Sequence, residues 1–183
     1  MNAKPLFAAS LIALALTSCS HSRPAPVPRP EGYPRLQLYP AAYHSIRIGA
    51  MELQVNDSVR VELTDTAAGW FNLRYPAYDI TVACTLSPIH SATQLTQVLA
   101  NRTERLNRNL GQARAAAVQV PPRNALLLKA PAATLTPLQF LVTDSASYVL
   151  SGVAMMTCEV NPDSVAPVVN AVESDIIHLL QQL

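Results

Sequence analysis

Cys19 is the residue whose sequence context most clearly predicts chemistry. It follows Lys4 and the apolar stretch 6–16, which is too short to span a bilayer as a stable helix. Residues 16–19, Leu-Thr-Ser-Cys, have the pattern of a lipobox, the sequence that lipoprotein signal peptidase reads. We predict cleavage before Cys19 and attachment of two or three acyl chains, which hold a protein on a membrane far more firmly than one. An ordinary secretory signal with an incidental cysteine is the alternative.

Four other residues could do chemistry, and each has a structural alternative. Asp175 and His178 are three residues apart, so in a helix they share a face and could form an acid–base dyad. We favour the alternative, in which they hydrogen-bond to a neighbouring helix or strand. Asp144 and Ser145 fall at an expected turn, which their own side chains can cap without any catalytic role. We therefore place all four on a candidate functional surface and predict no catalytic residue.

Two cysteines remain once Cys19 is acylated. Cys84 and Cys158 fall on the inward faces of expected strands, and an exported chain meets an oxidising compartment. The sequence is thus compatible with one disulfide between them and equally with two buried free thiols. No Cys-x-x-Cys occurs, so neither a redox motif nor a structural zinc site is predicted.

The rest of the sequence offers little to an enzyme or to a nucleic-acid-binding protein. It has no Gly-x-Ser-x-Gly, no phosphate-binding glycine loop and no His-Glu-x-x-His. We predict no enzymatic activity, no cofactor and no metal. The 13 Lys+Arg and 12 Asp+Glu become 12 and 12 once Lys4 leaves with the signal peptide. A balanced charge argues against nucleic acid as a partner, because phosphate binding demands a basic surface.

Short runs that alternate with a period of two, or that are wholly apolar, predict β-strands. They are residues 35–38, 51–55, 59–63, 70–75, 79–86, 125–130, 138–143 and 148–160. Gly152 interrupts the last run, which predicts either a bulge or a close approach of another group to the backbone.

Two helices are predicted by apolar residues at intervals of three and four. The first begins at a cap on Ser91, with Gln94 completing a capping box, keeps its apolar face as far as Ala117 and ends before Pro121-Pro122. The second is capped at 163 or 164, with Pro167 in its first turn. The order of elements predicts an α+β fold: a mostly antiparallel sheet of about seven to eight strands with two helices packed on it.

Composition divides the chain into three parts. Residues 1–18 are the expected signal peptide, which is removed, and residues 19–34 are the lipidated cysteine with a proline-rich tether. Residues 35–183 are expected to form a single α+β domain, of a length that supports one core. No apolar run after the signal peptide is as long as a transmembrane helix, so we expect the lipid to be the membrane attachment.

Several blocks of residues together resemble a known family, the gliding-motility lipoprotein GldD family of the Bacteroidetes. The most specific lie in the C-terminal third, and the others include the Gly-Tyr after the prolines and a Trp, Asn and Tyr-Pro strand. The blocks are residues 29–33, 70–76, 137–145, 150–152, 162–167 and 175–179. The resemblance runs from about residue 29 to residue 183. The sequence departs from the family at Pro34, where we expect an aromatic residue, and at Cys84 and Cys158, where we expect aliphatic ones.

The resemblance implies a membrane lipoprotein needed for gliding and associated with the secretion apparatus that delivers surface adhesins. We expect a non-enzymatic component or assembly factor of the gliding and type IX secretion machinery. Its partners would be membrane lipid, through Cys19, and other proteins of that machinery. The alternative is a periplasmic small-ligand-binding protein or hydrolase that uses a cleft between sheet and helix. Residues 20–22 carry no acidic residue that would signal inner-membrane retention or surface export, so we expect the periplasmic side of the outer membrane.

Overall fold

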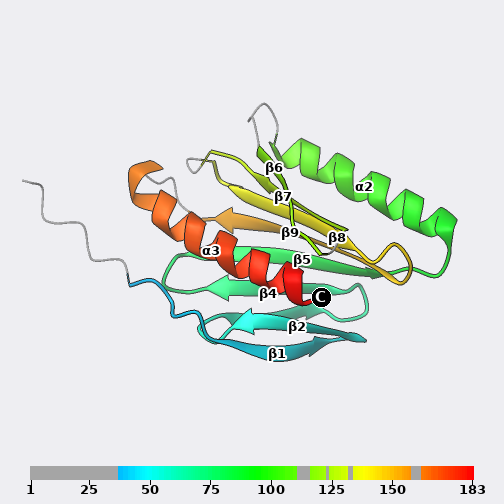
Figure 1. Cartoon of the computed structure of the whole chain (residues 1–183), viewed down its shortest axis with the longest axis horizontal. Coiled ribbons are helices and arrows are strands. Elements are labelled where there is room, and N and C mark those ends of the chain that lie inside the picture. The colour runs from blue at the N-terminus through cyan, green and yellow to red at the C-terminus, as the bar shows by residue number, and fades with distance from the viewer. Residues whose placement is uncertain (1–36, 111–115, 123, 132–133, 158–161) are drawn as a thin grey trace, which may run out of the picture. The chain divides into compact units, whose positions relative to one another are not determined.

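The computed structural model of the chain describes residues 37–110, 116–122, 124–131, 134–157 and 162–183 (Figure 1). Within them the chain forms a seven-stranded antiparallel sheet, a separate two-stranded hairpin and two helices. In chain order the elements are β1 (Tyr43–Ile48), β2 (Met51–Asn56), β3 (Arg60–Asp65), β4 (Trp70–Tyr75), β5 (Ile80–Pro88), α2 (Ala92–Leu110), β6 (Ala116–Gln119), β7 (Asn124–Lys129), β8 (Leu138–Thr143), β9 (Tyr148–Met156) and α3 (Pro162–Gln182). The predicted α+β fold with a mostly antiparallel sheet is confirmed.

The large sheet has the strand order β3-β4-β5-β9-β8-β7-β6, which places its two longest strands, β5 and β9, next to each other. Their pairing is continuous from Ile80 opposite Met156 to Pro88 opposite Tyr148. Side chains alternate between the two faces of a strand, so the even-numbered residues of β5 and β9 share one face. That face is the apolar one and belongs to the main core.

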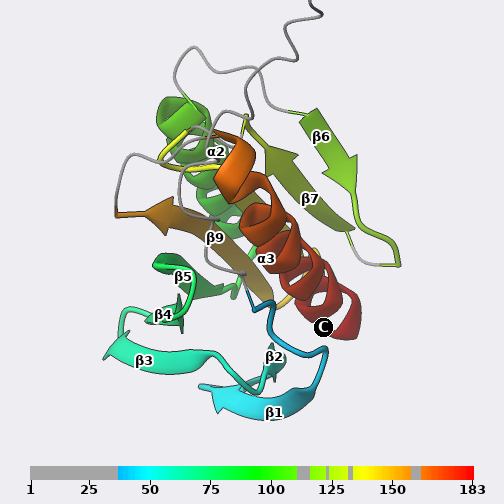
Figure 2. The same ribbon diagram turned by 90° about the vertical axis from the view of Figure 1, so that its left-hand side faces the viewer.

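The two helices cover opposite faces of the large sheet (Figure 2). α3 contacts β2 and β8, and its Val168, Val172 and Ile176 belong to the main core. α2 contacts β8 and β9 from the other side. Its Arg102 donates a hydrogen bond of 3.1 Å to Oγ of Ser87, an odd-numbered residue of β5. The core therefore lies between the sheet, α3 and the hairpin, while α2 packs on the outer face.

Gly152 is a place of close approach and not a bulge, because the β5–β9 register runs through it without a shift. It pairs with Phe140 of β8 on the inner face. A Cβ at position 152 would lie 2.3 Å from Cε1 of the Phe140 ring. The absent side chain thus leaves the space that the fully buried ring fills.

The first predicted helix begins as expected but ends earlier. The N–H of Gln94 donates to Oγ of Ser91 at 3.2 Å, and Oε1 of Gln94 accepts from the N–H of His90 at 2.8 Å. The helix α2 ends at Leu110, and Ala117 lies instead in the edge strand β6, opposite Leu128 of β7. The prediction that the helix keeps its apolar face as far as Ala117 was therefore wrong, although alanine favours a helix. Pairing with β7 decides the structure there.

The ends of the predicted strands differ most from the structure. Residues 37 and 38 are not in a strand, and residues 35 and 36 lie outside the described residues. The first strand is β1, which was not predicted and which pairs with β2 across a turn at Gly49 with φ of 60°. β9 ends at Met156, and residues 158–160 of the predicted run lie outside the described residues.

The last helix begins at Pro162, one or two residues before the predicted caps. Pro167 therefore lies inside the helix and not in its first turn, and its ring removes one backbone hydrogen bond there. In the described part of the chain, neither helix combines the length and the hydropathy that crossing a bilayer requires.

Candidate functional site

Asp175 of α3 joins the helix to both strands of the hairpin. Its Oδ1 accepts a hydrogen bond of 2.9 Å from the hydroxyl of Tyr43 in β1 and one of 3.3 Å from Nδ2 of Asn56 in β2. Nδ2 of Asn56 also donates to the backbone oxygen of Pro40 at 2.9 Å. One carboxylate thus joins α3 to two strands that lie more than a hundred residues earlier in the sequence.

His178 makes a second connection one turn further along α3. Its ring stacks on the ring of Tyr43, with centroids 3.7 Å apart and an angle of 18° between the planes. Its Nε2–H donates to Oε1 of Gln54 in β2 at 3.1 Å. Asp175 and His178 therefore share a helix face, as predicted, but each bonds to the hairpin. This geometry is the strand-to-helix connection that we favoured over an acid–base dyad.

Burial governs the electrostatics of this polar cluster. It raises the pKa of the Asp175 carboxyl above its usual 3.8, although hydrogen bonds from Tyr43, Asn56 and Tyr75 and the charge of His178 oppose the change. Burial, followed by the hydrogen bond to Asp175, raises the pKa of Tyr43 to about 12. The pKa of Tyr75 is raised well above 10.0 by burial and by the neighbouring carboxylate. Both phenols therefore stay protonated and act as hydrogen-bond donors.

Three tyrosine rings next to this cluster fix the start of the folded chain. Tyr39 stacks on Tyr78, with centroids 4.5 Å apart, and lies 6.3 Å from the ring of Tyr75. The hydroxyl of Tyr39 also accepts a hydrogen bond of 2.9 Å from the N–H of Ala77. Nothing in the sequence pattern predicted this stack, because it joins residues before β1 to the turn between β4 and β5.

Asp144 and Ser145 are used by the turn between β8 and β9. Oδ1 of Asp144 accepts from the three consecutive backbone N–H groups of residues 146–148, at 2.8 to 3.1 Å, and Oδ2 accepts from the hydroxyl of Ser147. These hydrogen bonds outweigh its slight burial and hold the pKa of Asp144 far below 3.8. Ser145 has φ of 64° and donates its N–H to Oγ1 of Thr143 at 2.9 Å. Their geometry is that of a turn capped by its own side chains.

The candidate functional surface is therefore split between two places. Asp175 lies beside Tyr75, the last residue of β4. Tyr75 pairs with Ile80 of β5, and Ile80 pairs with Met156, so Asp175 is near the C-terminal end of β9. Asp144 binds the start of β9, eight residues away, which at 3.3 Å per residue is about 26 Å. A single active site cannot use both pairs.

Cys84 is buried, and burial raises the pKa of its thiol. Cys19 and Cys158 lie outside the described residues, so lipidation and the disulfide stay predictions. The strand register shows what a disulfide between Cys84 and Cys158 would require of the chain. Cys84 pairs with Gly152, which lies four residues before the end of β9. A bond would need the chain after Met156 to turn back along β5, since bridged Cα atoms lie less than about 7 Å apart. Among the described residues, no group of three or more His, Cys, Asp or Glu side chains could hold a metal ion.

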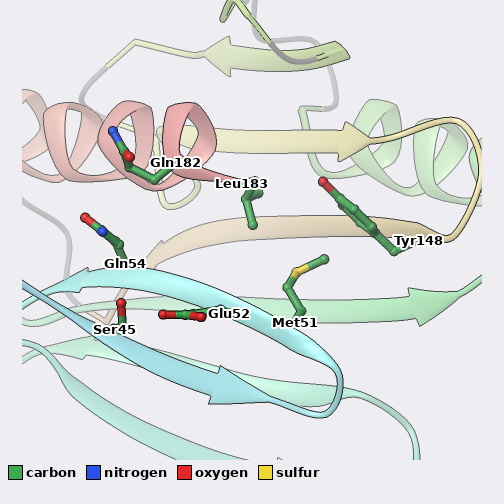
Figure 3. Close-up of a pocket in the computed structure, with 7 residues that line it drawn as sticks. All are labelled: Ser45, Met51, Glu52, Gln54, Tyr148, Gln182 and Leu183. Carbon is green, nitrogen blue, oxygen red and sulfur yellow. The ribbon is translucent and has the colours of Figure 1, made fainter.

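An open cleft lies between the hairpin, the end of α3 and the start of β9. It consists of two neighbouring depressions that share Met51 and Tyr148. The smaller one, of about 320 Å³, is lined also by Glu52, Gln54 and Gln182 (Figure 3). The larger one, of about 420 Å³, extends past the β1–β2 turn to the β3–β4 turn and the end of β5. Neither depression is lined by Asp144, Asp175 or His178, so sequence reasoning did not find this cleft.

Comparison with known proteins gives one family. The family model described as "Gliding motility lipoprotein GldD" matches residues 23–183. None of the curated proteins matches the chain. Among solved structures, the solution structure of cyanobacterial PsbP (CyanoP) from Synechocystis sp. PCC 6803 is similar, with 15% identity and a TM-score of 0.43 over 82% of this chain and 97% of that one.

Proposed function

Because the chain belongs to the family of gliding motility lipoproteins GldD, we propose that it is a non-enzymatic component or assembly factor of the gliding and type IX secretion machinery. The observation that carries the proposal is the family match, which extends from the proline-rich segment to the last residue. The chain is thus a gliding-motility-associated lipoprotein of the cell envelope. Its exact role in the machinery and its orientation are the proposed part.

Anchoring would follow from the three parts of the sequence. Signal peptidase removes residues 1–18, acyl chains on Cys19 hold the protein in the outer membrane, and residues 19–34 separate the lipid from the domain at 35–183. The lipobox at residues 16–19 and the lack of an acidic residue at 20–22 support this arrangement. The domain then faces the periplasm, where it can contact other proteins of the machinery.

A role in assembly agrees with how the polar residues are used. Asp175 and His178 hold the hairpin onto α3, and Asp144 caps its own turn. These three side chains are hydrogen-bonded to other groups of the domain and thereby stabilise its fold. A hydrolase or small-ligand-binding protein, the alternative, would need some of them to reach a ligand.

Deletion of the gene and complementation with variants tests the proposal. The wild-type chain and the matched control Ser20→Ala should both restore gliding and secretion, whereas Cys19→Ala should restore neither, because the protein loses its lipid. Full activity of Cys19→Ala would show that anchoring is dispensable. Affinity isolation of the wild-type protein from detergent-solubilised membranes should recover other components of the machinery, and a monomer without them would contradict the assembly role. Protease treatment of intact cells should leave the domain uncut if it faces the periplasm.

A further inference from the structure

The two halves of the open cleft differ in chemistry. The larger half is lined by the apolar residues Ile48, Leu86 and Pro88 and by no charged side chain. The small residues Gly49 and Ala67 also line it and occupy little of its volume. The smaller half presents the hydroxyl of Ser45, the amides of Gln54 and Gln182 and the carboxylate of Glu52 (Figure 3). An occupant that fits both halves has a large apolar group next to hydrogen-bonding groups, as an extended peptide has.

The rim of the larger half is held rigid by its turns. The N–H of Leu86 donates to the backbone oxygen of Gly69 at 2.8 Å, and a Cβ at Gly69 would lie 2.0 Å from the Leu86 oxygen. Oδ1 of Asp65 accepts from the N–H groups of Ala67 and Ala68 at 3.0 Å each. On the opposite side Asp144 fixes residues 146–148. A cleft with a preformed rim binds without the cost of ordering it.

The segments that form the cleft are acidic overall. Glu52 lies in β2, Asp65 is the last residue of β3 and Asp144 lies in the β8–β9 turn, and all three are exposed. Arg47, opposite Glu52 across the hairpin, is the basic residue on these segments. Three carboxylates against one guanidinium leave a net negative field, which attracts basic groups and repels acidic ones.

We infer that this cleft docks a segment of a partner protein in which a large apolar side chain is flanked by basic residues. The inference rests on the proposed function, since an assembly factor needs a surface for its partner. The apolar side chain fills the larger half, the backbone amides of the segment bond to Gln54 and Gln182, and the basic groups face the carboxylates. A side-chain anchor suits this open depression better than a small molecule, because small-ligand sites enclose most of the ligand surface.

A labelled peptide tests the cleft directly. The mature lipidated protein in phosphatidylcholine nanodiscs is titrated against fluorescein-labelled Gly-Lys-Leu-Lys-Gly-amide, with binding followed by anisotropy and empty nanodiscs as the blank. Replacing Leu by Ser in the peptide should weaken binding by about tenfold, the worth of one buried side chain. A Glu-Leu-Glu peptide should bind more weakly still, and added salt should weaken the Lys-Leu-Lys peptide. Equal binding of all three peptides, or no binding, would overturn the inference.

Variants locate the binding. Ala67→Trp fills the apolar half while keeping the backbone hydrogen bond to Asp65, and should weaken the Lys-Leu-Lys peptide by about tenfold. Glu52→Gln with Asp65→Asn removes two charges but keeps the acceptor oxygens, and should lower the salt dependence. The matched controls Ala100→Trp and Glu104→Gln lie on the exposed side of α2 and should bind as the wild type does. Cleft variants that bind as well as the controls would place the peptide elsewhere and refute the inference.

Isolation of complexes from membranes separates this inference from the proposed function. If the wild-type protein recovers machinery components and Ala67→Trp recovers them equally, the cleft is not the docking site but the assembly role stands. If the wild-type protein recovers none, the assembly role fails, and the peptide titration still decides whether the cleft binds basic apolar segments.

Discussion

The hydroxyl of Tyr43 and the carboxylate of Asp175 are joined by a hydrogen bond of 2.9 Å across 132 positions of sequence. This bond matters because β1 and β2 form a sheet of their own, without a backbone ladder to the large sheet in the described part of the chain. The hairpin is held by its apolar side chains, such as Leu53 in the core, and by polar bonds to α3. The same helix residues therefore decide how firmly the cleft wall is placed.

Tyr43→Phe should lower the free energy of unfolding by about 1 kcal/mol, because it removes the hydroxyl and leaves the ring stacked on His178. Urea denaturation followed by circular dichroism measures the change. Ser45→Ala, on the same face of β1, is the matched control and should change stability by less than about 0.5 kcal/mol. A Tyr43→Phe protein as stable as this control would show that the hydrogen bond contributes nothing net.

Asp175→Asn should change how stability depends on pH. Burial raises the pKa of Asp175 in the folded state above 3.8, so the folded protein holds this proton more tightly than the unfolded chain does. The resulting stabilisation is complete below 3.8 and is lost as the pH rises through the folded-state pKa. The asparagine keeps the acceptor oxygen for Tyr43 but does not titrate. Relative to wild type, the variant should therefore gain stability as the pH rises. Urea titrations at a series of pH values measure this change. A difference in the free energy of unfolding that is the same at every pH would refute the raised pKa of Asp175.

Asp144→Asn should show the opposite sign. Hydrogen bonds from the turn lower the pKa of Asp144, so its stabilising contribution is present above 3.8 and is lost as the pH falls through the lower folded-state value. The substitution should destabilise the protein at neutral pH and cost less on acidification below 3.8. Thermal melting at several pH values measures this. A cost that does not shrink in acid would mean that the turn depends on shape and not on charge.

Gly152→Ala should destabilise the sheet, because the new Cβ would lie 2.3 Å from the Phe140 ring, which has no free volume to enter. We expect a loss of about 1 to 3 kcal/mol, typical of overpacking in a core. Phe140→Leu alone creates a void and is also destabilising. Combining the two substitutions should cost less than the sum of the single changes, since each relieves the other. Strict additivity in denaturant titrations would contradict the close approach.

Local patterns in the sequence predicted much of the fold. The alternation in Trp70–Tyr75 and the even-numbered apolar residues of Ile80–Pro88 marked β4 and β5, and the polar spacing from Ser91 to Gln94 marked the start of α2. β1 was missed because Tyr43–Ile48 mixes polar and apolar residues on both faces, and its pairing with β2 supplies the order that its composition does not. In such strands the tertiary partner outweighs propensity.

The candidate site shows the same limit. The spacing of Asp175 and His178 correctly indicated one helix face, but their partners, Tyr43 and Gln54, are more than a hundred residues away. The cleft was out of reach for a related reason: its walls come from the hairpin, the end of α3 and segments of the large sheet that are far apart in the sequence. No local pattern contains that information.

The stack of Tyr39, Tyr75 and Tyr78 determines which part of the domain a force on the preceding chain would act on first. Tyr39 lies just after the first described residues and is clamped onto Tyr78 and the N–H of Ala77, in the turn that joins β4 to β5. A pull on the chain upstream of Leu38 therefore reaches the fold at the interior strands of the large sheet and bypasses the hairpin, which is held without a ladder to that sheet. In a gliding-motility lipoprotein of the cell envelope, tension on this segment would therefore act on the large sheet before it acts on the hairpin.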